Sequence, residues 1–242
     1  TMSNIEDQRK TSILLAVLCL GLTFVSANRT ALYPLLPIIG DKYRLTNTQL
    51  GTITSSYFLV YAAMQIPSGF LGDKVGKKRL LTAMYLLSGL ALLGFALLAK
   101  SYVSLVFFVA LHGLGAGSYY PSAFSMLLST VDSSRRATAA AVVGLGFSLG
   151  LILGLAASGP IYLYTGSFSG IFLILSILTL FMVPVFQKYL PDVKSSKAKS
   201  GKFDVGAILK NKNVLFINIA QFCALFGHWV AITWGPTFFV TE

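Results

Sequence analysis

The chain has 242 residues, of which 55% are hydrophobic and only 11% are charged. A soluble globular domain carries about 25% charged residues, so this composition excludes a water-soluble fold and indicates that lipid surrounds most of the chain. The formal net charge of +11 would suggest a nucleic-acid partner in a soluble protein, but basic residues of membrane proteins gather in cytoplasmic loops. We therefore predict that the protein is embedded in the lipid bilayer and does not bind nucleic acid.

Seven apolar segments are long enough to cross a bilayer, because a spanning helix needs roughly 20 apolar residues. They are predicted at 12–38, 47–71, 79–99, 102–129, 138–164, 168–187 and 214–240. The predicted fold is an all-α membrane protein with a six-helix N-terminal bundle over 1–187. A basic, Ser-rich linker at 188–213 follows, and then, at 214–242, the first helix of a truncated C-terminal bundle.

The basic residues indicate the orientation of these spans. With the N-terminus in the cytoplasm, fifteen basic residues fall on the cytoplasmic side, whereas Lys42, Arg44 and Lys100 fall outside. Cytoplasmic loops carry the excess of Lys and Arg in membrane proteins. The predicted location is the plasma membrane, crossed several times, with a cytoplasmic N-terminus.

The first span contains a charged residue, Arg29. A charge near the bilayer centre costs at least about 2.5–3.5 kcal/mol, and a guanidinium cannot lose its proton. None of the acidic residues lies well inside the first six spans. The counter-charge is expected from the solute or from a missing C-terminal half, unless the side chain reaches the outer interface. Tyr33, four residues on, shares the helix face of Arg29, although it also fits an interfacial anchor.

The second span begins with Thr46-Asn-Thr-Gln49, the pattern of a capping box, and ends in the segment Gly69 to Arg79, GFLGDKVGKKR. This segment resembles the signature loop of the major facilitator superfamily, G-x-L-[AG]-D-[RK]-x-G-[RK]-[RK], and it falls between the second and third spans as in that family. The resemblance implies a loop that holds two bundles together on the cytoplasmic side.

The predicted gating loop consists of Gly69, Gly72, Asp73, Gly76, Lys77, Lys78 and Arg79. Gly72 and Gly76 allow a tight turn because they lack a Cβ atom. The Asp73 carboxylate can accept charge-assisted hydrogen bonds from backbone N–H groups or from an arginine. The three basic residues also fit a simpler role, which is to set the topology.

The fourth and seventh spans supply further candidates for solute binding, because the superfamily lines its cavity with spans one, four and seven. They are His112, Tyr119, His228 and Trp234. His112 and Tyr119 are seven residues apart and share a helix face. His112 also fits a polar group that is satisfied by a neighbouring helix.

The fifth span contains glycines at intervals of four residues, Gly146, Gly150 and Gly154, followed by Gly159 and Pro160. Small residues on one face allow two membrane helices to approach closely. Pro160 lacks an N–H group and crowds the carbonyl of Ala156, which favours a bend. We predict that these five residues serve helix packing.

The sequence around Arg29 is similar to the anion:cation symporter branch of the superfamily. The similarity consists of Asn28-Arg29-Thr30, the 44 residues from Arg29 to Asp73, and Trp234-Gly-Pro-Thr in the seventh span. That branch carries organic acids and phosphate. In the fourth span the chain departs from the branch, because Val109 and Ala116 stand where the branch tends to have Arg and Glu.

The sequence therefore predicts a secondary active transporter that moves a small organic anion by alternating access. The alternatives are an efflux antiporter for drugs or sugars and a sensor that keeps the fold without transporting. A seven-helix retinal protein is excluded, since no lysine lies inside the seventh span. No nucleophile–base pair or metal-ligand spacing indicates an enzyme, and no cofactor is predicted. The coupling ion, a proton or sodium, is left open.

Overall fold

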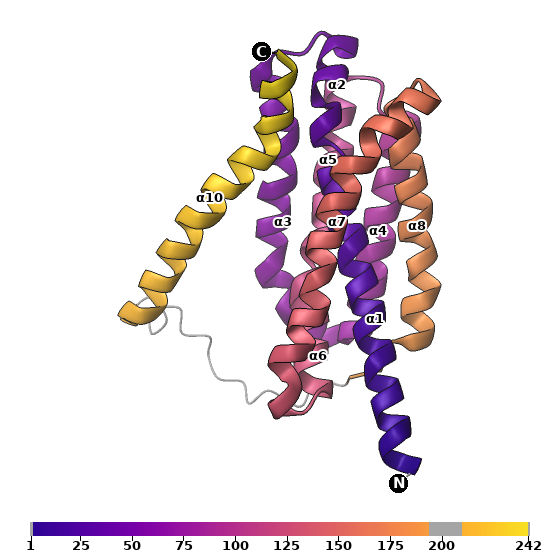
Figure 1. Ribbon diagram of the computed structural model, residues 1–242, viewed down its shortest axis with the longest axis vertical. Coiled ribbons are helices and arrows are strands. Elements are labelled where there is room, and N and C mark those ends of the chain that lie inside the picture. The colour runs from indigo at the N-terminus through magenta and orange to yellow at the C-terminus, as the bar shows by residue number, and fades with distance from the viewer. Residues whose placement is uncertain (1, 194–209, 242) are drawn as a thin grey trace. The chain divides into compact units, whose positions relative to one another are not determined.

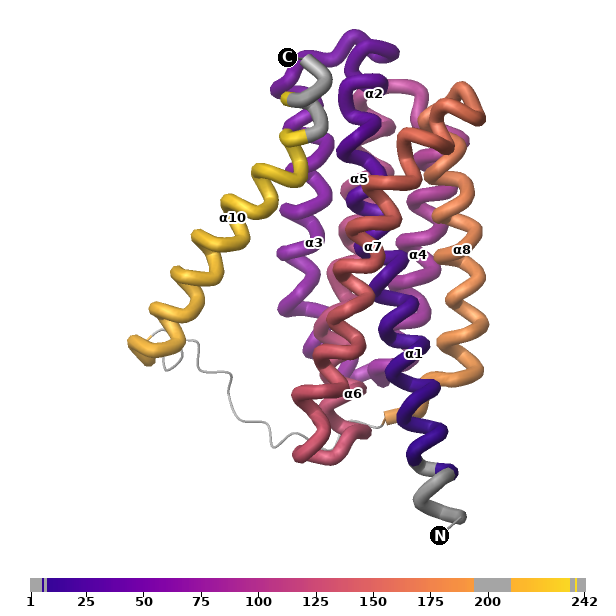
Figure 2. The backbone as a smooth tube through the Cα atoms, viewed as in Figure 1, coloured from indigo at the N-terminus to yellow at the C-terminus, as the bar shows by residue number. Residues whose placement is uncertain are grey.

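The computed structural model describes residues 2–193 and 210–241, and these residues form helices and no strand. The chain divides into two compact units, Thr1–Ser195 and Ser196–Glu242, and each is considered by itself. Figure 1 shows the helices of the first unit as a bundle, with the elements labelled, and Figure 2 traces the same path as a tube.

The helices follow the predicted spans, with shifted ends and two additional breaks. The first unit contains α1 (Met2–Thr30), η1 (Tyr33–Leu35), α2 (Leu36–Tyr43), α3 (Asn47–Val75), α4 (Lys77–Leu98), α5 (Tyr102–Gly117), α6 (Tyr119–Thr130), η2 (Ser133–Arg135), α7 (Arg136–Thr165) and α8 (Ser169–Tyr189). The second unit contains α10 (Lys212–Thr241). The predicted linker at 188–213 lies mostly outside the described residues.

Six stretches of the described residues are long and apolar enough to cross a membrane. They are Gln8–Tyr43, Lys77–Leu98, Tyr102–Thr130, Ser133–Thr165, Ser169–Tyr189 and Lys212–Gly235. The helix at the predicted second span, α3, has 29 residues but does not belong to this set. The reason is its composition, because Thr, Ser and Gln side chains recur along it.

Two predicted spans are broken rather than continuous. The segment predicted at 12–38 is interrupted between Thr30 and Tyr33 and continues to Tyr43, so Lys42 lies in α2 and not in a loop. Pro34 at the start of η1 has no N–H group to continue the ladder of α1. The segment predicted at 102–129 is divided at Ser118, between α5 and α6.

The helices of the first unit pack in pairs that follow an internal repeat of three plus three spans. α1 packs mainly against α7, α3 against α5, and α4 against both α8 and α5. In such a repeat α1 corresponds to α5, α3 to α7, and α4 to α8. The α1–α7 contact then corresponds to the α5–α3 contact, and the α4–α8 contact corresponds to itself. The same exchange relates the two broken spans. Inverted repeats with broken helices near their interface recur among membrane bundles.

The surface of this bundle is apolar, as the low charge content requires. Large hydrophobic side chains such as Leu59, Leu145, Leu163 and Phe181 are exposed, which suits a surface in contact with lipid. The capping box predicted at the start of α3 is confirmed: the Gln49 N–H donates to Thr46 Oγ1 at 3.3 Å, and the Thr46 N–H donates to Gln49 Oε1 at 2.9 Å.

Candidate functional site

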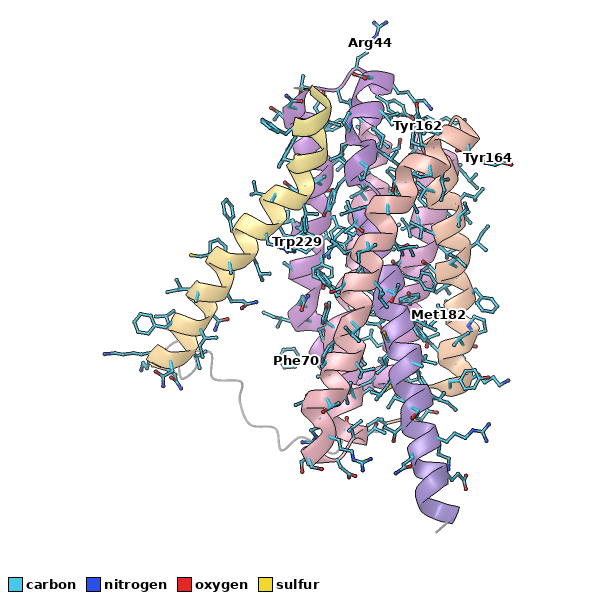
Figure 3. The ribbon with its side chains drawn as sticks, in the orientation of Figure 1. Arg44, Phe70, Tyr162, Tyr164, Met182 and Trp229 are labelled. Atoms are coloured by element: carbon cyan, nitrogen blue, oxygen red, sulfur yellow. The ribbon has the colours of Figure 1, made fainter. Side chains whose placement is uncertain are left out.

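Arg29 lies in the last turn of α1, directly before the break in the first span. Its side chain is 9% exposed, so a permanent positive charge is held inside the bundle. Arg44, at the C-terminal end of α2, provides a contrast because it is exposed and points away from the bundle (Figure 3). The surroundings of Arg29 must therefore compensate for the loss of water that Arg44 retains.

Three aromatic rings surround the Arg29 guanidinium. Its Cζ atom lies 5.9 Å and 5.7 Å from the ring centroids of Tyr57 and Phe58 on α3, and 5.6 Å from that of Phe147 on α7. A cation at about 6 Å from a ring centroid is attracted by the ring quadrupole, more strongly where water is excluded. Aromatic rings carry no net charge, so these contacts stabilise the guanidinium without neutralising it.

A cavity of about 20 Å³ adjoins Arg29, which is enough for about one water molecule. Its walls come from α1, η1, α3, α4, α5 and α8. The lining residues are Asn28, Arg29, Leu32, Tyr33, Thr54, Tyr57, Phe58, Leu92, Phe95, Phe108, Val109, His112 and Phe172. Apolar side chains dominate this lining.

The structure brings three of the predicted binding residues, Arg29, Tyr33 and His112, to this cavity. Tyr33 is 1% exposed and lies beyond the break, so it reaches the cavity from η1 rather than from one continuous helix face. His112 is 4% exposed, and its Nδ1 atom lies 2.7 Å from Ser88 Oγ on α4. Its ring lies 5.4 Å from the ring of Tyr57, which also contacts Arg29.

Tyr119 lies elsewhere, in the core of the bundle. Its hydroxyl donates to the Leu18 carbonyl on α1, and its ring packs at 5.9 Å from that of Tyr85. The residue begins α6, on the far side of the break at Ser118 from His112. Tyr119 therefore does not join His112 at this cavity, and its hydroxyl is engaged in a structural bond.

The remaining two predicted binding residues, His228 and Trp234, belong to α10 in the second unit. The His228 ring lies 5.7 Å from the ring of Trp229 in an edge-on arrangement, within the helix itself. Figure 3 labels Trp229 on α10. The second unit is described by itself, so the binding roles of these residues stay predictions.

Three polar residues of the cavity were not predicted from the sequence, namely Asn28, Thr54 and Tyr57. Asn28 carried a signal, because an amide beside Arg29 in an apolar span requires a partner, and its Nδ2 atom donates to Thr179 Oγ1 at 2.9 Å. The sequence contained no comparable signal for Thr54 or Tyr57. Hydroxyl-bearing residues recur along α3, and nothing in the sequence shows which of them face the bundle.

The segment predicted as a gating loop is mostly helical. Gly69, Gly72 and Asp73 belong to α3, whereas Lys77, Lys78 and Arg79 form the first turn of α4. Gly76 joins the two helices with φ of 95°, a region that side chains with a Cβ rarely adopt. The prediction that Gly72 also makes a turn was wrong, because this residue is helical. Lys78 Nζ lies 4.0 Å from Asp192 Oδ2, just beyond α8.

The glycines of α7 lie against the backbone of α1. A Cβ atom on Gly146, Gly150 or Gly154 would collide with the carbonyl oxygens of Cys19, Thr23 and Ala27, respectively. The two sets of residues keep the same spacing of four, so the helices approach closely along several turns. Gly159 differs, since no atom lies within 4 Å of its Cβ position. Pro160 lies inside α7, which continues to Thr165.

A model of one protein family matches most of the chain, residues 18–242, and that family is the Major Facilitator Superfamily. The chain belongs to the major facilitator superfamily. The hexuronate transporter of Bacillus subtilis (strain 168) is 30% identical over 89% of this chain and 53% of its own length. The multidrug efflux pump LfrA of Mycolicibacterium smegmatis is 32% identical over 64% of this chain and 31% of its own length.

The fold is also shared with a solved structure. A bacterial homologue of the human lysosomal transporter Spinster, in an inward-facing and unoccupied conformation, superposes with a TM-score of 0.78 at 18% identity. The match covers 95% of this chain and 55% of that one. This chain spans about half the length of the hexuronate transporter and of the Spinster homologue, or less in the case of LfrA.

Proposed function

We propose that the protein is a secondary active transporter that moves a small organic anion across a membrane by alternating access. The observation that carries the proposal is the Arg29 guanidinium, which is buried, permanently charged and adjacent to a cavity at the break in the first span. A guanidinium binds a carboxylate through two parallel hydrogen bonds. Hexuronate, the solute in the name of the Bacillus subtilis relative, is a carboxylate, which supports this class of solute.

The solute needs more space than the cavity beside Arg29, which has room for about one water molecule. We infer that the site widens to admit the anion during the conformational change that alternating access requires. Arg29, Tyr33 and His112 are the proposed contacts from the first bundle. His228 and Trp234 are the proposed contacts from the second bundle, of which α10 is the first helix.

The proposal includes the orientation and the gate. The bias of basic residues supports a cytoplasmic N-terminus in a plasma membrane. The junction of α3 and α4 then lies on the cytoplasmic side, where Asp73 and the basic first turn of α4 would latch one bundle to the other. A proton or a sodium ion is the proposed coupling ion.

The second candidate function is efflux of drugs or sugars, which the similarity to LfrA favours. The two candidates differ in what they require of Arg29. A carrier of organic anions needs the guanidinium as a counter-charge, whereas an efflux pump for cationic drugs gains nothing from a buried positive charge in its path.

Uptake into proteoliposomes tests the proposal, with the full-length protein and a hexuronate as the labelled anion. We expect Arg29→Ala to lower the initial uptake rate by a factor of 10 or more, because one charge-assisted pair contributes about 1.5–3 kcal/mol. Arg44→Ala is the matched control, since it removes an exposed arginine that lies at the end of α2, and it should transport as the wild type does.

Unchanged uptake in Arg29→Ala would remove Arg29 from the solute site. Failure of the wild type to carry hexuronate, together with export of cationic drugs, would favour the efflux function instead. A thermal melt of each variant shows whether a loss of uptake reflects misfolding.

A further inference from the structure

A separate cavity lies at the junction of α3 and α4, and it shares no lining residue with the cavity beside Arg29. It is open and has a volume of about 410 Å³. Its walls are the last turn of α3, the turn at Gly76, the first turn of α4, and Asp192 and Val193 shortly after α8. These walls expose polar as well as apolar surface, so a ligand with both kinds of group can contact them.

The cavity carries an excess of positive charge. Four of its lining residues are cations and two are carboxylates, namely Lys74, Lys77, Lys78 and Arg79 against Asp73 and Asp192. Lys78 Nζ lies 4.0 Å from Asp192 Oδ2, at the outer limit of an ion pair, and the Asp192 side chain is 77% exposed. A pair of this kind contributes little in water. Two positive charges remain even when both carboxylates are counted in full.

Membrane topology alone does not explain why these cations surround a cavity. The positive-inside rule requires only that Lys and Arg lie in the segment between two spans. Here Lys77, Lys78 and Arg79 form the first turn of α4, where the helix dipole and their mutual repulsion both disfavour positive charge. The turn at Gly76 joins this first turn to the last turn of α3, which contains Lys74. An anion bound among the four cations would offset these repulsions.

An exposed apolar stripe on α3 leads to the cavity. It consists of Leu59, Ile66 and Phe70, which are 74%, 66% and 54% exposed, and Phe70 is labelled in Figure 3. Their intervals of seven and four residues place them on one face of the helix, and Lys74 follows on that face four residues after Phe70. The positive charge of the cavity therefore adjoins an apolar surface of a bundle that spans the membrane.

We propose that this cavity binds the phosphate of an anionic phospholipid, with an acyl chain of the lipid against the apolar stripe of α3. Phosphate oxygens accept charge-assisted hydrogen bonds from Lys and Arg, and basic clusters at the ends of membrane spans attract anionic lipids. A dissolved phosphate would use the cations but not the stripe, which favours a lipid as the source. The inference does not rest on the proposed function, since it involves neither the solute nor Arg29.

The test measures lipid binding by the full-length protein after its lipids have been removed in detergent. Native mass spectrometry counts the lipids that bind when phosphatidylglycerol, with one negative charge, or phosphatidylcholine, with no net charge, is added. With the same acyl chains in both lipids, we expect the dissociation constant to be at least tenfold lower for phosphatidylglycerol. Equal affinity for the two lipids would overturn the proposal, because only the charge of the headgroup differs between them.

Two double variants locate the binding. Lys77→Gln with Lys78→Gln removes two cations from the cavity, and we expect the affinity for phosphatidylglycerol to fall about 20-fold, or about fivefold for each cation. Arg135→Gln with Arg136→Gln is the matched control, because it removes two exposed cations between α6 and α7, outside this cavity. The control should change the affinity by less than threefold. An unchanged affinity in the first variant, or equal losses in both, would contradict a site in the cavity.

Inorganic phosphate and glycerol 1-phosphate distinguish a lipid from a dissolved anion, because neither carries an acyl chain. We expect each to displace phosphatidylglycerol only at concentrations about 100-fold or more above that of the lipid. Displacement at equal concentration would assign the cavity to a soluble phosphate and refute the role of the stripe. A thermal melt of each variant shows that a loss of lipid binding does not reflect misfolding, and the comparison of the two lipids on the wild type needs no variant.

Discussion

Helix α1 contacts its neighbours in two different ways along its length. Toward α7 its backbone carbonyls meet the glycines Gly146, Gly150 and Gly154, with no space between them for a Cβ atom. Near Arg29, in its last turn before the break, it adjoins a cavity of about 20 Å³ that is lined mainly by apolar side chains. Close backbone packing fixes one arrangement of the two helices, whereas a charged and incompletely filled region can accept a ligand. The difference separates the scaffold of this bundle from its candidate site.

The largest effect is expected from a substitution that disrupts the close packing of α1 against α7. In Gly150→Val the new side chain overlaps the Thr23 carbonyl oxygen, a backbone atom that cannot rotate away. We expect a loss of about 3 kcal/mol of stability or failure to fold, measured by thermal melts and by the yield of monodisperse protein. Gly144→Val is the control, because no atom lies within 4 Å of its Cβ position. Equal losses in both variants would show that the glycine contact does not hold α1 and α7 together.

A smaller effect is expected at the junction of the two regions. Ser158 Oγ on α7 shares its hydroxyl proton between the Gly154 carbonyl of its own helix and the Ala31 carbonyl at 3.1 Å, next to the break between α1 and η1. Ser158→Ala should cost about 1 kcal/mol of stability, because a carbonyl at the break loses its donor. Ser148→Ala, an exposed serine of the same helix, should cost nothing measurable. If the Tm of the two variants were the same, Ser158 would not support the break.

The smallest effect is expected in the cavity itself. Val109→Ile adds one methylene beside a space of about 20 Å³, so we expect a change in stability below about 1 kcal/mol. The same substitution at Val143, a fully buried residue of α7 outside the cavity lining, should cost about 1–3 kcal/mol. Thermal melts of the two variants compare the two regions, because the same methylene group is added in each. A larger loss of stability in Val109→Ile than in Val143→Ile would contradict the proposed difference in packing between the two regions.

The sequence predicted the helices well because their signals are local. The capping box at Thr46 and Gln49 was confirmed, and so was the all-α membrane fold. The signature segment also located the junction between α3 and α4. Gly72, however, was wrongly assigned to the turn that Gly76 makes. Pro34 could have indicated the break in the first span, since proline lacks the N–H group that a helix interior needs.

The faces of the helices could not be predicted in the same way. In lipid both the core side and the outer side of a helix are apolar, so no amphipathic pattern shows which residues face inward. Tyr119 illustrates the difficulty, because a spacing of seven from His112 placed both on one face, and the break at Ser118 separates them. Tyr57 illustrates the converse, since its place between Arg29 and His112 follows from tertiary packing alone.

The central claim is that Arg29 binds the carboxylate of the solute, and a structure of the full-length protein with a bound organic anion tests it most directly. We predict a solute carboxylate within hydrogen-bonding distance of two N–H groups of the Arg29 guanidinium. A carboxylate of the protein paired with Arg29 in both the bound and the free states would contradict the claim, as would an anion bound elsewhere.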